Sequence, residues 1–272
     1  MDKLNELTKI QKEEEKLLIA SVMDKIKFVN TRENFKNTKF LDMAQIHTIN
    51  EVLKKIKFER YEFFGGFENA ERKMLIVYSE KIFTYLKEKN TIYNQIMKCI
   101  KIVLPKEQQN EYTHKTYLGA IMKLGIKREM IGDIIVNSEG AEILIASEIE
   151  NFLIDNLKLL TRFKKARIET INIESVNYVE PETKIIKINI SSMRLDAIIS
   201  ELAHVSRNEA QNIINDERVL INFKEELSYS KKVEEGTIIS IRGKGRFKII
   251  KISGMTKSGR LNLDIETYNW HN

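Results

Sequence analysis

Apolar residues in the first third of the chain recur three or four positions apart, as one buried face of a helix requires. One such stripe is made by Leu18, Val22, Ile26 and Val29. A second covers residues 43–56, and Asp42 before it, with Gln45 three positions later, predicts a helical capping box. A glycine pair and a strand-like run at 74–78 follow. We therefore expect a helical N-terminal domain over residues 1–72.

The middle of the chain alternates between strand and helix patterns. Strand-like runs occupy residues 96–105, 132–147 and 166–174. The second run contains a turn, so it predicts two strands. Helical patterns occupy residues 113–125 and a segment beginning at Ser147, where Glu150 completes an expected capping box. The resulting order of strand, helix, strand, strand, helix, strand is that of a ferredoxin-like plait. We expect this plait over residues 73–180.

The last third follows a linker-like stretch at 177–184 that contains a proline. Two short amphipathic helices are predicted, one with a buried face made by Leu195, Ile198, Ile199, Leu202 and Ala203, the next with Ala210, Ile213 and Ile214. Ser206 and Glu209 form a capping-box pattern, so the second helix is expected to begin at Arg207. Strand-like segments then continue to the end. We expect a small α+β domain over residues 181–272, and an α+β fold class for the chain as a whole.

Composition narrows the class of protein. The 272 residues suggest about two domains, or three small ones. No apolar run approaches the roughly 20 residues of a membrane span, and the polar N-terminus does not resemble a signal peptide, so we expect a soluble cytoplasmic protein. Cys99, the only cysteine, lies among apolar residues, which predicts a core position. The four histidines are scattered, so we expect no metal site.

The charge balance is basic, with 45 Lys and Arg against 39 Asp and Glu and a net charge of +6. Such an excess favours an anionic partner when it is clustered. Between Ser240 and Arg260 it is clustered, because that segment contains no Asp or Glu. Its basic residues are Arg242, Lys244, Arg246, Lys248, Lys251, Lys257 and Arg260. A solvated charged hairpin would explain them, but Phe247 nearby offers a stacking surface, and together they favour RNA or DNA binding.

Arg194 and Arg207 raise a second question, because each stands at the start of a predicted helix, where the helix dipole disfavours a cation. Free amides at a helix start attract phosphate, and an adjacent guanidinium adds a bidentate clamp. The alternative is that each arginine pairs with a nearby carboxylate, such as Asp196 or Glu209. One arginine alone would favour pairing. Two in a basic module favour phosphate binding.

The segment "MRLDAIISELAHVSRNEAQNIINDERVLIN", with "VEEGTIISIRGKG" after it, resembles the S-four domain (S4 domain), a small RNA-binding module. It departs from the usual pattern at three positions: Glu217 and Phe223 replace glycines, and Thr237 replaces an aspartate. The RNA-binding candidates are Arg194, Ser206, Arg207, Arg218, Lys224, Lys231, Arg242, Lys244, Arg246 and Lys248.

Together with "GGFENAERK" and "THKTYLGAIMKLGIKREMIGDIIV", this segment makes the chain similar to the YlmH-type proteins of Gram-positive bacteria. That resemblance implies a helical N-terminal part, a middle domain like an RNA-recognition motif, and a non-catalytic factor that binds ribosomal RNA and tRNA. Its expected target is the large ribosomal subunit carrying a stranded peptidyl-tRNA, in ribosome-associated quality control. No cofactor or small-molecule substrate is expected. The middle strands lack an obvious pair of exposed aromatics, so we expect the resemblance of this domain to an RNA-recognition motif to be one of shape, without base stacking.

Two other functions compete with this interpretation. An S-four domain can anchor an RNA-modifying enzyme, but the chain lacks a glycine-rich cofactor loop, and Asn262 stands where a pseudouridine synthase would carry its aspartate. The second alternative is an adaptor protein linked to cell division, with the helical N-terminal part as its docking surface.

Overall fold

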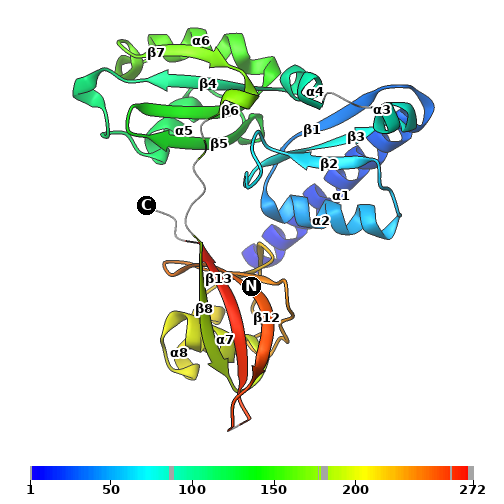
Figure 1. The fold of residues 1–272 in the computed structure, drawn as a ribbon, viewed down its shortest axis with the longest axis vertical. Coiled ribbons are helices and arrows are strands. Elements are labelled where there is room, and N and C mark those ends of the chain that lie inside the picture. The colour runs from blue at the N-terminus through cyan, green and yellow to red at the C-terminus, as the bar shows by residue number, and fades with distance from the viewer. Residues whose placement is uncertain (1, 86–88, 177, 179–182, 258, 269–272) are drawn as a thin grey trace. The chain divides into compact units, whose positions relative to one another are not determined.

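The computed structural model describes residues 2–85, 89–176, 178, 183–257 and 259–268 (Figure 1). By its internal contacts the chain divides into two compact units, residues 1–178 and residues 179–272. None of the described helices combines the length and the apolar character that crossing a bilayer requires. Each unit has its own hydrophobic core and is described by itself.

The first unit begins with α1 (Asp2–Thr31) and α2 (Met43–Lys55) against a sheet of β1 (Phe35–Leu41), β3 (Lys73–Tyr78) and β2 (Tyr61–Phe64), in the order β1-β3-β2. The predicted apolar stripe of α1 supplies Val22, Ile26 and Val29 to the core. The capping box also forms, since Asp42 accepts the amide of Gln45 while the Gln45 side chain accepts the amide of Asp42.

The prediction of a helical domain ending at residue 72 needs correction. Strand β3 begins at Lys73 and pairs with β1 on one side and β2 on the other. A boundary at residue 72 would therefore remove the central strand of the N-terminal sheet. The first 72 residues also contain two strands, β1 and β2, which the sequence pattern did not predict. A division of the chain into three domains remains a proposal.

The middle of the chain continues with α3 (Glu80–Tyr85), α4 (Lys89–Ile96), β4 (Met97–Val103), α5 (His114–Lys123), β5 (Ile131–Asn137), β6 (Gly140–Ala146), α6 (Glu150–Leu159) and β7 (Arg167–Ile171). The strands form one antiparallel sheet in the order β5-β6-β4-β7. This is the split βαβ arrangement of a ferredoxin-like plait, as predicted. The predicted capping box at Ser147 is wrong, because Ile149 is the N-cap residue of α6 and its side chain does not cap the helix. The Ser147 hydroxyl donates to the Gln95 carbonyl at 2.7 Å. A short 3-10 helix (Ser147–Ile149) precedes α6 there.

The two sheets of this unit share one core. Phe40, Met74 and Tyr78 from the N-terminal sheet belong to the same buried cluster as the middle strands, and so does Cys99. Burial raises the pKa of the Cys99 thiol to about 12, which suits the predicted core role. Asp133 on β5 helps hold the sheets together, since its carboxylate accepts the amides of Glu71 and Arg72 at 2.6 and 3.1 Å.

The second unit contains β8 (Thr183–Ile190), α7 (Leu195–Ala203), α8 (Arg207–Asn215), β9 (Val219–Ile221), β10 (Lys224–Glu225), β11 (Ile238–Ile241), β12 (Gly245–Met255) and β13 (Leu261–Tyr268). Its strands are ordered β10-β9-β11-β12-β13-β8. Both predicted helices exist, and their apolar faces join the core through Leu195, Ile198, Ala210 and Ile214. Among the described residues, no cluster of three or more His, Cys, Asp or Glu side chains is arranged to hold a metal ion.

Candidate nucleic-acid interface

The start of α8 is fixed by the predicted capping box. The amide of Glu209 donates to the Ser206 hydroxyl at 3.3 Å, and the amide of Ser206 donates to the Glu209 carboxylate at 2.8 Å. His204 ends α7 in the left-handed conformation, with φ of 56°. The chain therefore reverses within a few residues, and α8 begins at Arg207 as expected.

Asp196 in α7 brings the two candidate arginines together. Its carboxylate accepts hydrogen bonds from Arg194 Nε at 3.1 Å, from Arg194 Nη2 at 2.9 Å and from Arg207 Nη2 at 3.0 Å. Gln211 Nε2 donates to the same carboxylate at 3.1 Å. One carboxylate thus holds a guanidinium from the start of each of the two helices, and the pairing that the sequence left as an alternative does form.

This pairing leaves both cations accessible. The Asp196 side chain is fully buried, but 37% of the Arg194 side chain and 47% of the Arg207 side chain are exposed. Burial alone would raise the pKa of Asp196, but the hydrogen bonds from Arg194, Arg207 and Gln211 outweigh it and hold that pKa well below its usual range. The carboxylate is therefore charged at neutral pH. Two positive charges share one negative charge, so the exposed side of the cluster stays positive.

The starts of α7 and α8 differ in the number of backbone amides that are available to bind a phosphate. Arg194 is the N-cap residue of α7 and does not lie inside its first turn. The first two amides of α7 are already occupied, since Leu195 N donates to the Lys231 carbonyl and Asp196 N donates to the Tyr229 carbonyl. The expectation of free amides is therefore wrong for α7. In α8, the amides of Arg207 and Asn208 make no hydrogen bond within the described residues.

The β11–β12 turn carries the predicted basic run. Arg218 Nη2 donates to the Arg242 carbonyl at 3.1 Å, and the Arg242 amide donates to the Arg218 carbonyl at 2.9 Å, so the side chain and the backbone of Arg218 both bond the backbone of Arg242. Lys244 lies exposed at the tip of the turn, and Lys248 is half-buried on β12. Phe247 was expected as a stacking surface, but only 7% of it is exposed because the alternation of β12 turns it into the core.

The aromatic ring beside this turn is that of Phe223. Asn222 and Phe223 form the two-residue turn between β9 and β10 with φ of 47° and 67°, where glycine is usual at the second position. The guanidinium of Arg246 lies 5.0 Å from the centroid of the Phe223 ring. Glu217 also adopts the left-handed conformation, with φ of 58°. Both of these departures from the S4 pattern therefore keep the backbone conformation that the missing glycines would supply.

The remaining candidates lie near Arg194 or at the sheet edge. Lys231 forms an ion pair with Glu226, so part of its charge is neutralised within the protein. Lys224 is exposed on the edge strand β10. Tyr229 was not singled out from the sequence, yet it is 43% exposed, and the Arg194 guanidinium lies 5.9 Å from its ring centroid. Only tertiary proximity to Arg194 distinguishes it from any other loop tyrosine.

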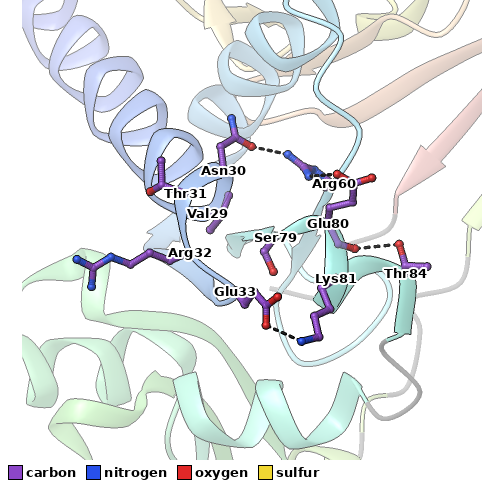
Figure 2. Close-up of a pocket in the computed structure, with 10 residues that line it drawn as sticks. All are labelled: Val29, Asn30, Thr31, Arg32, Glu33, Arg60, Ser79, Glu80, Lys81 and Thr84. Carbon is purple, nitrogen blue, oxygen red and sulfur yellow. Dashed lines mark hydrogen bonds and ion pairs between the residues drawn. The ribbon is translucent and has the colours of Figure 1, made fainter.

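A pocket of about 540 Å³ lies elsewhere, at the C-terminal end of α1 in the first unit (Figure 2). Its polar groups are largely paired with one another. Arg60 donates to the Asn30 side chain, and Lys81 pairs with Glu33 at 2.6 Å. These internal pairs leave few polar groups directed at a small molecule, so we do not assign the pocket a ligand.

Comparison with known proteins gives two family matches. Residues 95–180 match the family model described as "Putative RNA-binding domain in YlmH", and residues 193–239 match the S4 domain. The chain is similar to the curated "Ribosome-associated protein quality control protein P2" of Bacillus subtilis strain 168, with 27% identity over 257 residues, which is 94% of this chain and 96% of that protein. It is also similar to the solved structure of "Cell division protein ylmH from Streptococcus pneumoniae", with 23% identity and a TM-score of 0.47, over 60% of this chain and 95% of that chain. The S4 match contains both arginines and the whole α7–α8 pair.

Proposed function

Since the chain joins a YlmH-type RNA-binding domain to an S4 domain, we propose that it is a non-catalytic protein that binds structured RNA. The observation that carries this proposal is the Asp196 cluster. It presents two half-exposed guanidiniums side by side, next to the start of α8, where two backbone amides remain available. Guanidiniums and amides in this arrangement suit phosphate oxygens, which supply most of the affinity of RNA-binding surfaces.

The target that fits best is the large ribosomal subunit carrying a stranded peptidyl-tRNA, within ribosome-associated quality control. The similarity to a Bacillus subtilis protein named for that process, over nearly the full length of both chains, supports this choice. Ribosomal RNA and tRNA would contact the S4 domain through their phosphate backbones. The basic turn at 242–248 extends the positive surface beyond the two arginines.

The decisive experiment sediments the full chain with isolated small subunits, with large subunits, and with large subunits carrying peptidyl-tRNA. The test variant is Arg194→Ala/Arg207→Ala. The matched control is Lys184→Ala/Lys187→Ala, which removes two exposed positive charges from β8 of the same unit. Comigration with the large subunit, increased by peptidyl-tRNA and abolished only in the arginine variant, is the expected result.

Two further outcomes separate the parts of the proposal. Binding to free RNA without comigration with either subunit would reject the ribosomal target and keep the RNA-binding role. Normal comigration of the arginine variant, with its fold intact, would remove the Asp196 cluster from the interface. In RNA titrations, removing two arginine–phosphate pairs should reduce the slope of log K against log salt by about 1.4 to 1.8.

A further inference from the structure

The middle domain cannot bind RNA on its sheet in the way its fold suggests. In strand β6 all seven residues are buried, and successive side chains of a strand point to opposite faces, so both faces are covered there. Part of the cover comes from the turn at Gly65–Phe67. A Cβ at Gly66 would lie 2.6 Å from Leu144, and the Phe67 ring stacks on Tyr178 at 3.9 Å. An RNA contact of this domain must therefore use another surface.

The turn from α6 to β7 offers such a surface (Figure 1). Residues 156–168 contain five cations and no acidic residue. One of the five, Arg167, pairs with Glu169 at 3.4 Å. The other four are exposed, and a fifth exposed cation, a lysine, lies on the first turn of α5. We call this set the α6–β7 basic patch, made by Lys115, Lys158, Arg162, Lys164 and Lys165. Within the described residues, none of the five forms an ion pair.

The patch is held in place by an aromatic anchor. Phe163 is 1% exposed and stacks on Tyr117 of α5 at 5.7 Å, which draws the turn against that helix. Arg162 Nη1 donates to the Thr116 carbonyl at 3.3 Å, and the Tyr112 hydroxyl donates to the Arg162 carbonyl at 3.3 Å. These contacts bring the turn beside the first turn of α5, where Lys115 lies.

A set of exposed cations without carboxylate partners fits a polyanion better than it fits fold stability, because like charges repel one another in the unbound protein. Phe163, the one aromatic residue of the turn itself, is buried and offers no face on which a base would stack. We propose that the α6–β7 basic patch is a second RNA contact, which binds the phosphate backbone of helical RNA without reading its sequence. This inference rests on the proposed RNA-binding function and adds a site outside the S4 domain.

The patch is tested with Lys158→Ala/Lys164→Ala/Lys165→Ala in the full chain. Arg162 is left unchanged because it also contacts the Thr116 carbonyl. The matched control removes three exposed lysines scattered over the same unit, Lys55, Lys106 and Lys123. The probes are two double-stranded RNAs of about 20 base pairs with unrelated sequences, titrated over a range of salt concentrations.

The patch variant should bind both RNAs about tenfold more weakly, and its salt slope should fall by about 0.7 to 0.9 for each phosphate that the substituted lysines no longer neutralise. The control variant should bind normally, and both should keep the wild-type melting temperature. Arg194→Ala/Arg207→Ala is measured alongside. If it weakens binding while the patch variant does not, the second RNA-binding surface is refuted and the S4 interface stands. If neither weakens binding, both proposals fail. The patch variant is also sedimented with large ribosomal subunits. If it binds both RNAs normally but no longer comigrates with the subunit, the patch contacts a ribosomal protein and the proposal is overturned.

Discussion

The substitution Asp196→Asn separates the folding role of the Asp196 cluster from its RNA-binding role. It keeps the size of the side chain and leaves both arginines in place, but it replaces one acceptor oxygen with an amide nitrogen, which can only donate. Arg194, Arg207 and Gln211 all present donors to this position, so at least one donor would face another. The variant therefore weakens the link between α7 and α8 without removing a positive charge.

The expected loss of stability follows from the exposure of the partners. A buried hydrogen bond to a charged group contributes about 1.5 to 3 kcal/mol, and four such bonds reach this carboxylate. The guanidiniums are partly exposed and regain water when released, so most of that sum is recovered. We expect a loss of about 2 to 3 kcal/mol for the second unit.

The sign of the pH dependence gives a second, independent check. An aspartate in the unfolded chain has a pKa of about 3.9, and the pKa of folded Asp196 is depressed below this. Its stabilising contribution is therefore complete above about pH 4 and is lost as the pH falls further. The difference between wild type and Asp196→Asn should shrink below about pH 4.

Native-state hydrogen exchange is the suitable assay, because it reads each unit separately in the full chain. Amides of α7 and α8 should exchange faster in the variant, while those of the first unit serve as an internal reference. The matched control is Asp216→Asn, an exposed residue at the end of α8. Unchanged protection of α7 and α8, or a difference that does not vary between about pH 3 and about pH 6, would refute the reasoning.

Three further predictions concern stability. Glu217→Gly should stabilise the second unit by about 1 kcal/mol in urea titrations, because glycine adopts the left-handed conformation without the cost of a Cβ. Gly66→Ala should destabilise the first unit by about 1 to 3 kcal/mol, seen as faster exchange in β6, because φ is 98° and the new Cβ would collide with Leu144. Burial raises the pKa of Asp133 to about 6, so stability of the first unit should fall as the pH rises from about 4 to about 6, and Asp133→Asn should flatten that decline.

Local signals explain which parts of the fold the sequence predicted. The capping boxes at Asp42 and Ser206 and the two helices of the S4 domain depend on residues a few positions apart, and all of them form. The Ser147–Glu150 pair has the same residue pattern, but residues 147–149 form a 3-10 helix, so the N-cap position of α6 falls at Ile149 and not at Ser147. Strands β1 and β2 were missed because they flank β3 in a sheet whose pairing spans tens of residues.

The RNA-binding candidates also divide into features that local sequence signals predict and features that depend on tertiary packing. Helix positions and charge clustering pointed to Arg194 and Arg207, but sharing of Asp196 depends on how α7 packs on α8, which periodicity does not specify. The inward direction of Phe247 was available from the sequence, because it alternates with Arg246 and Lys248 as a half-buried strand requires.

The shared carboxylate also decides when binding competence appears. Arg194 and Asp196 are two residues apart, so their pairing is local to the start of α7, whereas Arg207 reaches Asp196 only when α8 has docked on α7. Once both bonds have formed, the rotamer entropy of both side chains has already been lost during folding, so a later encounter with RNA does not have to order them. The complete pair of positioned cations therefore exists only when α7 and α8 are packed together, and a partly folded chain would leave Arg207 unplaced.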